Sequence, residues 1–231
     1  MGRRIAAIIR HGDYHQMAGA PSAHQPYPLN TSGKKHAAEA ANIIDEIQQL
    51  NGWSIAAEID CSQMLRAWQT ADIIAQTLNS SHKLQLQSFD DLAERCVGSA
   101  ANLTAEQIGQ VIHDDPRYDE LPQNWKSNSE YRLPLQGAES LLDAGQRVAE
   151  HLNLRLSLLA ANAPDTLKLF VGHGASFRHA AFHLGVIKYD DIARLSMFHG
   201  RPVFLELLQD GSWVHIDGEW KIRTTNSKFR D

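Results

Sequence analysis

Cysteine is scarce in this chain of 231 residues, which contains only Cys61 and Cys96. Two cysteines cannot build the disulfide framework of a small secreted domain, and they are too few for a cysteine-rich zinc site. The spacing from Cys61 to Arg66 is also one residue too short for the phosphate loop of a cysteine phosphatase. We therefore expect a protein of a reducing compartment, with the cytoplasm as its location.

Long hydrophobic runs are absent as well. The apolar run Ile5 to Ile9 ends at Arg10 and is much shorter than a membrane span or the apolar core of a signal peptide. An excess of positive charge is also lacking: 22 Lys and Arg face 27 Asp and Glu, a net charge of −5 with neutral histidines. Such a chain has no general attraction for nucleic acid or membranes, so neither is an expected partner. An anionic ligand must instead be held by a local cluster of cations.

Short apolar segments alternate with segments of helical periodicity. The predicted strands are Arg4 to Ile9, Ser54 to Cys61, Leu84 to Leu86 and Leu167 to Val171, followed by a hairpin of Val203 to Leu208 with Trp213 to Ile216. The predicted helices are Ser32 to Leu50, Leu65 to Leu78, one beginning at Thr104, Glu139 to Ala161, and Ser176 to Leu184. This order predicts an α/β fold, a three-layer sandwich with a mostly parallel central sheet flanked by helices, forming a single domain over residues 1–231.

The segment from Asp90 to Gln136 does not follow this alternation. Its clearest element is the helix at Thr104, where Thr104 and Gln107 form a capping-box pair. The part from Asp114 to Gln136 contains three prolines and shows no clean period. So long an irregular segment in a compact domain is usually a lid or a binding loop, so we expect a lid-like insertion at about residues 88–136.

Polar residues follow three of the predicted strands. Arg10-His11-Gly12 and Gly172-His173-Gly174 each come directly after a buried strand, and Ser62 and Arg66 lie just past another. Ligands of parallel sheets bind at the carboxyl ends of the strands, so these residues are expected to converge. The sequence thus predicts two arginines beside two histidines at one edge of the sheet.

Such a cluster can bind and attack a phosphoryl group. Guanidinium groups bind phosphate bidentately and stay charged at any biological pH, and Gly12, Gly172 and Gly174 would let a phosphate approach backbone N–H groups. A neutral histidine can act as the nucleophile when its other ring nitrogen donates to a fixed acceptor. From the residues alone, either His11 or His173 can take this role.

Six short motifs occur in colinear order between residues 4 and 208. They are Arg10 to Gly12, Pro28 to Gly33, Cys61 to Ala71, Leu92 to Gly98, Gly137 to Ser140, and Val171 to Gly174. In this order they resemble the signature motifs of the histidine phosphatase superfamily, also called the phosphoglycerate mutase-like family. The resemblance implies a phosphoryl-transfer enzyme that uses a phosphohistidine and needs no cofactor.

The resemblance also implies a role for individual residues. His11 would attack phosphorus and carry the phosphoryl group. Arg10, Arg66 and His173 would bind its oxygens, with Gly174 beside them.

Glu94 would protonate the leaving oxygen and later activate water against the phosphohistidine. Arg95 and Ser62 are possible substrate-binding residues. The cations of the irregular segment, Arg117, Lys126 and Arg132, are further candidates for contact with the substrate.

The loop after the first motif favours a phosphatase. Residues 13–17 lack the asparagine expected in the mutase branch, and no Lys or Arg lies between His11 and Lys34 to hold a second phosphate or a carboxylate. We therefore expect hydrolysis of a small phosphorylated substrate. Two alternatives stay open: a 2,3-bisphosphoglycerate-dependent mutase, to which the Glu94-Arg95 pair is similar, and a phosphoprotein phosphatase, to which the run Arg10 to His15 has a faint similarity.

A metal-dependent hydrolase is the alternative from another class. His11 with His15, and His179 with His183, have the spacing that places two imidazoles on one helix face. His11 precedes a loop, however, and the second pair lacks the glutamate of a zinc-protease helix. We therefore expect no metal in the site. No pattern in the sequence indicates an oligomeric state.

Overall fold

A six-stranded sheet with the order β3-β2-β4-β1-β6-β7 forms the centre of the computed structural model, which describes residues 2–21, 24–80, 82–160 and 162–223. The strands are β1 (Arg4–Arg10), β2 (Ser54–Ser62), β3 (Gln85–Phe89), β4 (Thr166–Gly172), β6 (Pro202–Leu207) and β7 (Trp213–Asp217). Strands β3, β2, β4 and β1 pair in parallel. Strand β6 pairs antiparallel with β1 and with β7, so the predicted hairpin is confirmed.

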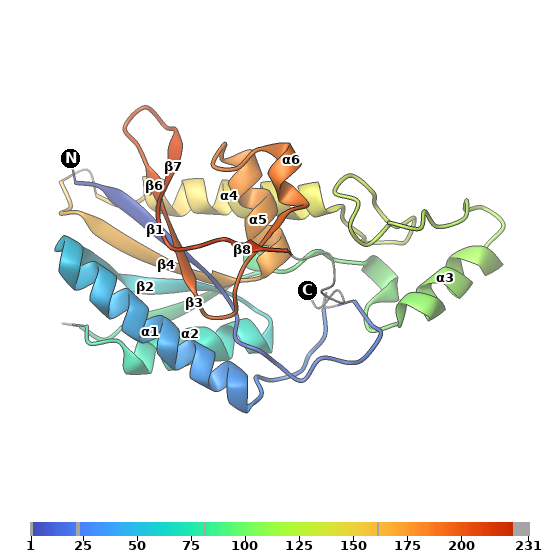
Figure 1. Cartoon of the computed structure of the whole chain (residues 1–231), viewed down its shortest axis with the longest axis horizontal. Coiled ribbons are helices and arrows are strands. Elements are labelled where there is room, and N and C mark those ends of the chain that lie inside the picture. The colour runs from blue at the N-terminus through green and yellow to red at the C-terminus, as the bar shows by residue number, and fades with distance from the viewer. Residues whose placement is uncertain (1, 22–23, 81, 161, 224–231) are drawn as a thin grey trace.

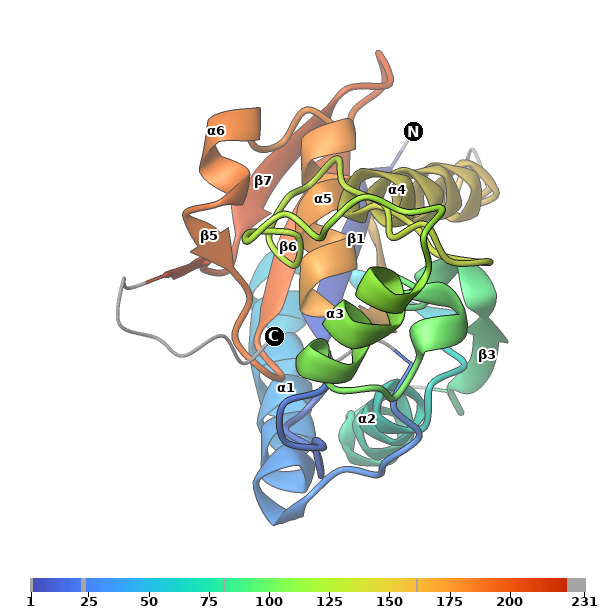
Figure 2. The ribbon, with the colours of Figure 1, turned by 90° about the vertical axis from the view of Figure 1, so that its right-hand side faces the viewer.

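Helices cover both faces of this sheet (Figures 1 and 2). Helices α1 (Thr31–Asn51) and α2 (Leu65–Thr77) lie on one face, and α4 (Leu141–Ser157) and α5 (Gly174–His183) lie on the other. The alternation along β1 explains the arrangement. Ile5 and Ile9 pack into the cluster containing α1 and α2, whereas Ala6 and Ile8 pack into the cluster containing α4 and α5. The predicted three-layer α/β fold is confirmed.

Side-chain caps set the ends of the helices. Asn30 accepts a hydrogen bond from the Gly33 N–H at the start of α1, and Gly52 ends the helix in the left-handed conformation at φ 68°. The capping box predicted at Thr104 is present. Helix α4 begins after Ser140 instead of at Glu139, because the Ser140 hydroxyl caps it, and it ends at Ser157. Its predicted end, Ala161, lies outside the described residues.

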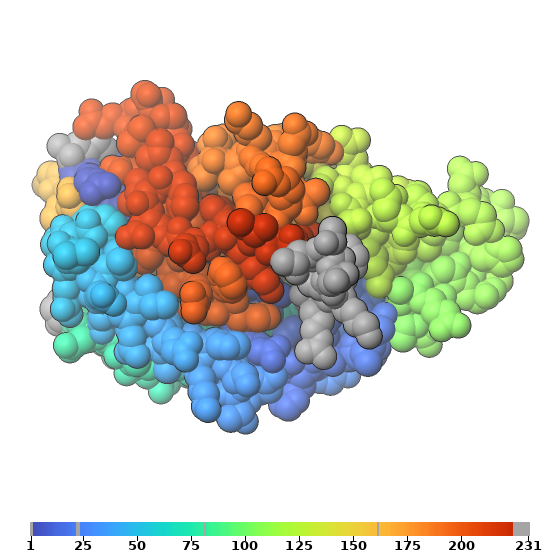
Figure 3. All heavy atoms as spheres, in the orientation of Figure 1, coloured from blue at the N-terminus to red at the C-terminus, as the bar shows by residue number. Residues whose placement is uncertain are grey.

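The chain leaves the sheet between β3 and α4. It forms two short 3-10 turns, η1 (Asp90–Leu92) and η2 (Gly98–Ala100), then α3 (Ala105–Asp114), and it has no further helix or strand before α4. Apolar side chains of this segment form a separate cluster, which consists of Val97, Ala100, Ile108, Trp125, Leu133 and Ala138. The segment projects from one end of the molecule (Figures 1 and 3). It is irregular as predicted, and its function as a lid stays a prediction.

Three short elements near the C-terminal end were not predicted, because they are too short for a periodic pattern. They are α6 (Tyr189–Ile192) and the paired strands β5 (Leu195–Ser196) and β8 (Lys221–Ile222). The chain between β5 and β6 passes beside the end of β1, where the Gly200 N–H donates to the Arg10 carbonyl at 2.9 Å. Within the described part of the chain, no helix is long and apolar enough to span a membrane.

Candidate active site

Parallel pairing brings the two histidine motifs to the same edge of the sheet. Arg10 at the end of β1 lies opposite Gly172 at the end of β4. The next backbone N–H, that of His11, donates to the Gly172 carbonyl at 2.9 Å. The ring centroids of His11 and His173 are 5.0 Å apart, and Ser62 ends the neighbouring strand β2. The predicted convergence of these residues is therefore present.

Arg66 lies at the centre of this cluster, on the first turn of α2, and its side chain is fully buried. Its Nε donates to Nε2 of His11 at 3.1 Å, and Nη2 donates to Nδ1 of His173 at 3.2 Å. Nη1 donates to the Gln25 carbonyl at 2.9 Å, and the guanidinium lies 4.5 Å from the centroid of the Tyr14 ring. One buried cation thus contacts both histidines.

The partners of the two histidines fix their tautomers. Nδ1 of His11 lies 2.7 Å from the Gly12 carbonyl, which can only accept, so Nδ1 carries the proton and Nε2 keeps its lone pair toward Arg66. His173 has the opposite tautomer, because Nδ1 accepts from Arg66 and Nε2 donates to Oγ of Ser62 at 3.0 Å. Burial and then the charge of Arg66 hold the pKa of both histidines well below the ordinary value. Both rings are therefore neutral at physiological pH.

Arg10 is the second buried guanidinium of the site. Its Nη1 donates to the Met197 carbonyl at 3.0 Å. A Cβ at Gly174, the first residue of α5, would lie 2.9 Å from Cδ of Arg10, so the missing side chain makes room for this arginine.

The expectation that Gly12 opens its backbone to a phosphate is wrong. The Gly12 N–H donates to Oγ1 of Thr70 at 3.0 Å. A Cβ at Gly12 would overlap the backbone of Gly33 in α1. This glycine therefore serves the contact between the end of β1 and the start of α1.

Glu94 lies against the N-terminus of α5, and it is 7% exposed. Its carboxylate accepts hydrogen bonds from the backbone N–H groups of Arg95 at 2.9 Å, Ser176 at 3.1 Å and Ala175 at 3.3 Å. Helix N-termini hold negative charge favourably, because their first N–H groups have no partner within the helix. Burial lowers the pKa of Arg66 and the negative charge of Glu94 opposes that change, so this acid lies within electrostatic reach of the cluster.

Arg95 extends the site toward the irregular segment. Its guanidinium lies 5.6 Å from the centroid of the Trp125 ring, and Nζ of Lys126 lies 5.8 Å from the same ring. Burial and the charge of Arg95 lower the pKa of Lys126, so these two cations are neighbours. Arg117, another candidate cation, forms an ion pair with Asp115 of the same segment, and Arg132 forms one with Asp143 in the first turn of α4.

Three residues at the site were missed by the sequence reasoning. Tyr14 contacts Arg66 and also lies edge-on to His11 at 5.4 Å between ring centroids. Gln25 supplies the carbonyl that binds Arg66. His199 donates from Nδ1 to the His11 carbonyl at 2.7 Å, and burial lowers its pKa to about 3. Gln25 and His199 lie in irregular segments without a recognisable motif. Tyr14 belongs to the run Arg10 to His15, but nothing in that run indicated its contact with Arg66, which depends on the fold.

The pair His179 and His183, considered above as metal ligands in the alternative of a metal-dependent hydrolase, has other partners. His179 contacts the Ala175 carbonyl through Nδ1 at 2.7 Å and Oγ of Ser129 through Nε2 at 3.0 Å. His183 contacts the Leu142 carbonyl at 3.0 Å. Among the residues that the structure describes, no group of three or more His, Cys, Asp or Glu side chains could hold a metal ion.

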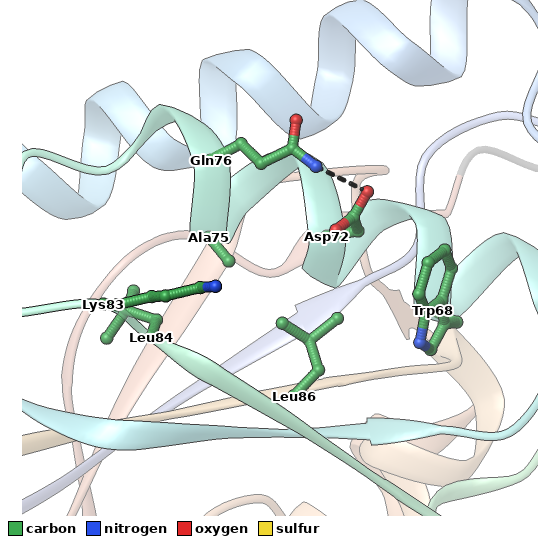
Figure 4. Close-up of a pocket in the computed structure, with 7 residues that line it drawn as sticks. All are labelled: Trp68, Asp72, Ala75, Gln76, Lys83, Leu84 and Leu86. Atoms are coloured by element: carbon green, nitrogen blue, oxygen red, sulfur yellow. Dashed lines mark hydrogen bonds between the residues drawn. The ribbon is translucent and has the colours of Figure 1, made fainter.

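A separate hollow of about 540 Å³ lies between α2 and β3 (Figure 4). It is lined by Trp68, Asp72, Ala75, Gln76, Lys83, Leu84 and Leu86. Gln76 donates to Asp72 at 2.8 Å within it, and none of the predicted site residues contributes to its wall. The candidate active site is therefore defined by the strand ends and not by this hollow.

A family model for branch 1 of the histidine phosphatase superfamily matches residues 6–215. The chain belongs to the histidine phosphatase superfamily. A 2,3-bisphosphoglycerate-dependent phosphoglycerate mutase of Corynebacterium kroppenstedtii is 30% identical over an alignment of 177 residues, and the match covers 69% of this chain and 69% of the relative. The family predicted from the sequence motifs is confirmed, and the chain is an enzyme of the histidine phosphatase class.

Solved structures share the fold of this histidine phosphatase family member. A mycobacterial glucosyl-3-phosphoglycerate phosphatase matches with a TM-score of 0.68 at 18% identity, covering 95% of this chain and 97% of that one. A phosphoglycerate mutase from Bacillus anthracis matches with a TM-score of 0.70 at 15% identity, covering 93% and 92%. An alpha-ribazole phosphatase from Shigella flexneri gives 0.68 at 17% identity, covering 92% and 94%. Proteins named as phosphatases and as mutases therefore have this fold in common.

Proposed function

We propose that this enzyme hydrolyses phosphomonoesters through a phosphohistidine on His11. The observation that carries the proposal is the contact of Arg66 with both Nε2 of His11 and Nδ1 of His173. Attack on phosphorus needs a neutral imidazole with a free lone pair, and the lowered pKa of His11 provides the neutral form. The buried guanidinium beside that lone pair supplies the charge that attracts a phosphoryl group.

In the first step, the phosphoryl oxygens bind Arg10, Arg66 and His173. The N–H groups that Arg66 directs at the two imidazoles turn to the phosphoryl oxygens, which frees the lone pair on Nε2 of His11. A bond forms from Nε2 to phosphorus as the bond from phosphorus to the leaving oxygen breaks. Glu94 in its acid form gives its proton to that oxygen. Once Arg66 has turned to the phosphoryl group, the proton of His173 moves to Nδ1, which donates to a phosphoryl oxygen, and Nε2 accepts from the Ser62 hydroxyl.

In the second step, Glu94 acts as a carboxylate and takes a proton from water. The hydroxyl oxygen attacks phosphorus, the bond from phosphorus to Nε2 of His11 breaks, and inorganic phosphate is released. The imidazole returns to the neutral form that the buried site favours. One carboxylate therefore serves both steps without a metal ion or a cofactor.

The choice of a phosphatase rests on the loop after His11. It brings no Lys or Arg to the site before Lys34, so it supplies no permanently charged cation to hold a second anionic group. The second candidate, a mutase, is favoured by Arg95 and Lys126, which lie together near Trp125 and could bind such a group.

The test is a panel of small phosphomonoesters and a phosphopeptide, with and without 2,3-bisphosphoglycerate, scored for phosphate release and for isomerisation. Isomerisation without phosphate release would replace the phosphatase by the mutase.

The covalent step is tested by rapid quenching with labelled substrate and peptide mapping. His11→Ala should abolish both turnover and labelling, whereas His173→Ala should slow turnover and leave some label. The label should be labile in acid and stable in base, as a bond from phosphorus to nitrogen requires. Label on His173 or on a serine, or no label in an active sample, would overturn the mechanism.

A further inference from the structure

Arg147 of α4 binds the chain just before Glu94. Its Nη1 donates to the carbonyl oxygens of Asp90 at 3.2 Å, Asp91 at 2.8 Å and Ala93 at 3.2 Å. The Nη2 side of the guanidinium faces Glu139, and the Arg147 side chain is 22% exposed. A single nitrogen thus gathers three backbone carbonyls that immediately precede the proposed general acid.

Glu139 binds the chain just after Glu94. Its two carboxylate oxygens accept from Nε and Nη2 of Arg147 at 3.0 and 2.9 Å, a bidentate pairing. The same carboxylate accepts from the Cys96 N–H at 3.0 Å, and the Glu139 N–H donates to the Cys96 carbonyl at 2.8 Å. Glu94 and Arg95 therefore lie on a short bridge, both ends of which are attached to one ion pair.

The helices on which this bridge rests are also held together closely. The carboxylate of Glu94 accepts from the first turn of α5, and Arg147 belongs to α4. A Cβ at Gly145, two residues before Arg147, would overlap His179 of α5, so the two helices meet there without an intervening side chain. The position of Arg147 relative to the N-terminus of α5 is thereby fixed.

We propose that Arg147, paired with Glu139, is the positioning residue of Glu94. All three of its guanidinium nitrogens donate to Glu139 or to the carbonyls before Glu94, so it acts by holding the bridge in the place from which the Glu94 carboxyl reaches the leaving oxygen. The inference rests on the proposed function of Glu94 as the general acid. A displacement of about 1 Å at such a group costs on the order of 100-fold in rate, so loss of the clamp should be visible in the acid step.

The structure offers a matched control on the same helix. Arg155 of α4 is 17% exposed, and it binds Glu58 at 2.7 Å and Asp60 at 2.7 Å. Its other partners, Gln87 and Phe89, belong to β3, before the segment that Arg147 holds. Removal of either arginine costs stability, but only Arg147 is attached to the segment that carries Glu94. Arg147→Lys keeps the charge felt by His173 and loses the forked contacts.

The experiment compares an alkyl phosphate with an activated aryl phosphate, whose leaving group needs no proton, in Glu94→Gln, Arg147→Ala, Arg147→Lys, Glu139→Gln and Arg155→Ala. Arg147→Ala should lower kcat/KM, which reports the acid step and not the later hydrolysis of the phosphohistidine, at least about 10-fold more for the alkyl ester than for the aryl ester. Arg147→Lys and Glu139→Gln should show the same selectivity at lower amplitude, which covers the case in which Arg147→Ala does not fold. Arg155→Ala should lower the melting temperature and affect both esters equally.

The double variant Glu94→Gln/Arg147→Ala should lose no more selectivity than Glu94→Gln alone, because the arginine acts through the acid. One result would overturn the positioning role and leave the acid role intact. In it, Glu94→Gln loses more activity for the alkyl ester than for the aryl ester, whereas every Arg147 variant loses equal activity for both esters. Equal losses in Glu94→Gln itself would overturn the proposed function of Glu94, and this inference with it. Full recovery in Arg147→Lys would assign the effect to charge and would also overturn the inference.

Discussion

Asp60 on β2 accepts a hydrogen bond from Nε2 of His151 on α4 at 2.9 Å, and both side chains are buried. The same carboxylate binds Nε of Arg155 at 2.7 Å and Nζ of Lys168 at 2.7 Å. Burial raises the pKa of Asp60, but these three partners together bring it below the ordinary value. A charged group thus lies between the sheet and α4, two residues before Ser62 of the active site.

Asp60→Asn is expected to destabilise the protein by about 3–5 kcal/mol, because it leaves the buried ammonium of Lys168 without its ion-pair partner. The measurement is urea unfolding at pH 7. Glu58→Gln is the control, since Glu58 is more exposed and its pair with Arg155 should contribute less than about 1 kcal/mol. Equal effects of the two substitutions would show that the buried carboxylate has no special role.

Glu94→Gln is expected to lower turnover mainly for substrates with poor leaving groups. General acid catalysis contributes about 10²- to 10⁴-fold, and an activated aryl phosphate needs little of it. The measurement is kcat/KM for a series of esters with increasing leaving-group pKa, because kcat/KM reports formation of the phosphohistidine and not its hydrolysis, in which Glu94 serves every substrate alike. The dependence of kcat/KM on that pKa should be steeper in the variant. If both kinds of ester lose activity equally, the acid is another residue, with Asp90 or Asp91 next in line.

Stability is expected to fall as the pH drops below about 6.5. Burial lowers the pKa of His179 and of His199 to about 3 in the folded protein, whereas an unfolded histidine titrates near 6.5. Between these values the unfolded state binds more protons, so each histidine costs about 1.4 kcal/mol per pH unit as the pH falls. Urea unfolding at pH 7, 6 and 5 measures the slope. His199→Gln should reduce that slope by about 1.4 kcal/mol per pH unit, and an unchanged slope would contradict a buried neutral His199.

Phosphate release is expected to persist in a metal chelator. The positive charge of the site comes from Arg10 and Arg66, so no ion is needed to bind the phosphoryl group. The measurement is turnover before and after dialysis against EDTA, with added zinc or magnesium as the control. Activity that disappears in the chelator and returns with either metal would favour a metallohydrolase.

Local patterns in the sequence were sufficient for most of the fold. The uninterrupted apolar run of β1 identified a strand buried on both faces, and Thr104 and Gly52 marked the start of one helix and the end of another. The motifs at the strand ends then located His11 and His173, because parallel pairing sends both to one edge. These features depend on neighbours along the chain, so they can be derived without coordinates.

Contacts between distant segments could not be derived in this way. Gly12 was expected to face a phosphate, but the space beside it belongs to Gly33, and this depends on how α1 meets β1. Glu139 was placed inside a helix, whereas it precedes α4 and pairs with Arg147. His199 carries no motif at all, and its contact with the His11 carbonyl requires the chain to return to β1 after β5.

The pairing of β1 with β4 also has a kinetic meaning. His11 and His173 are far apart in the sequence, and their rings lie side by side only when these two strands are in register. A chain emerging from the ribosome cannot assemble the site until β4 has followed β1 out, and such non-local pairing is slow compared with helix formation. The return of catalytic activity during refolding should therefore lag behind the return of helical circular dichroism. The rate at which activity returns during refolding thus reports the rate at which β1 pairs with β4 in the central sheet.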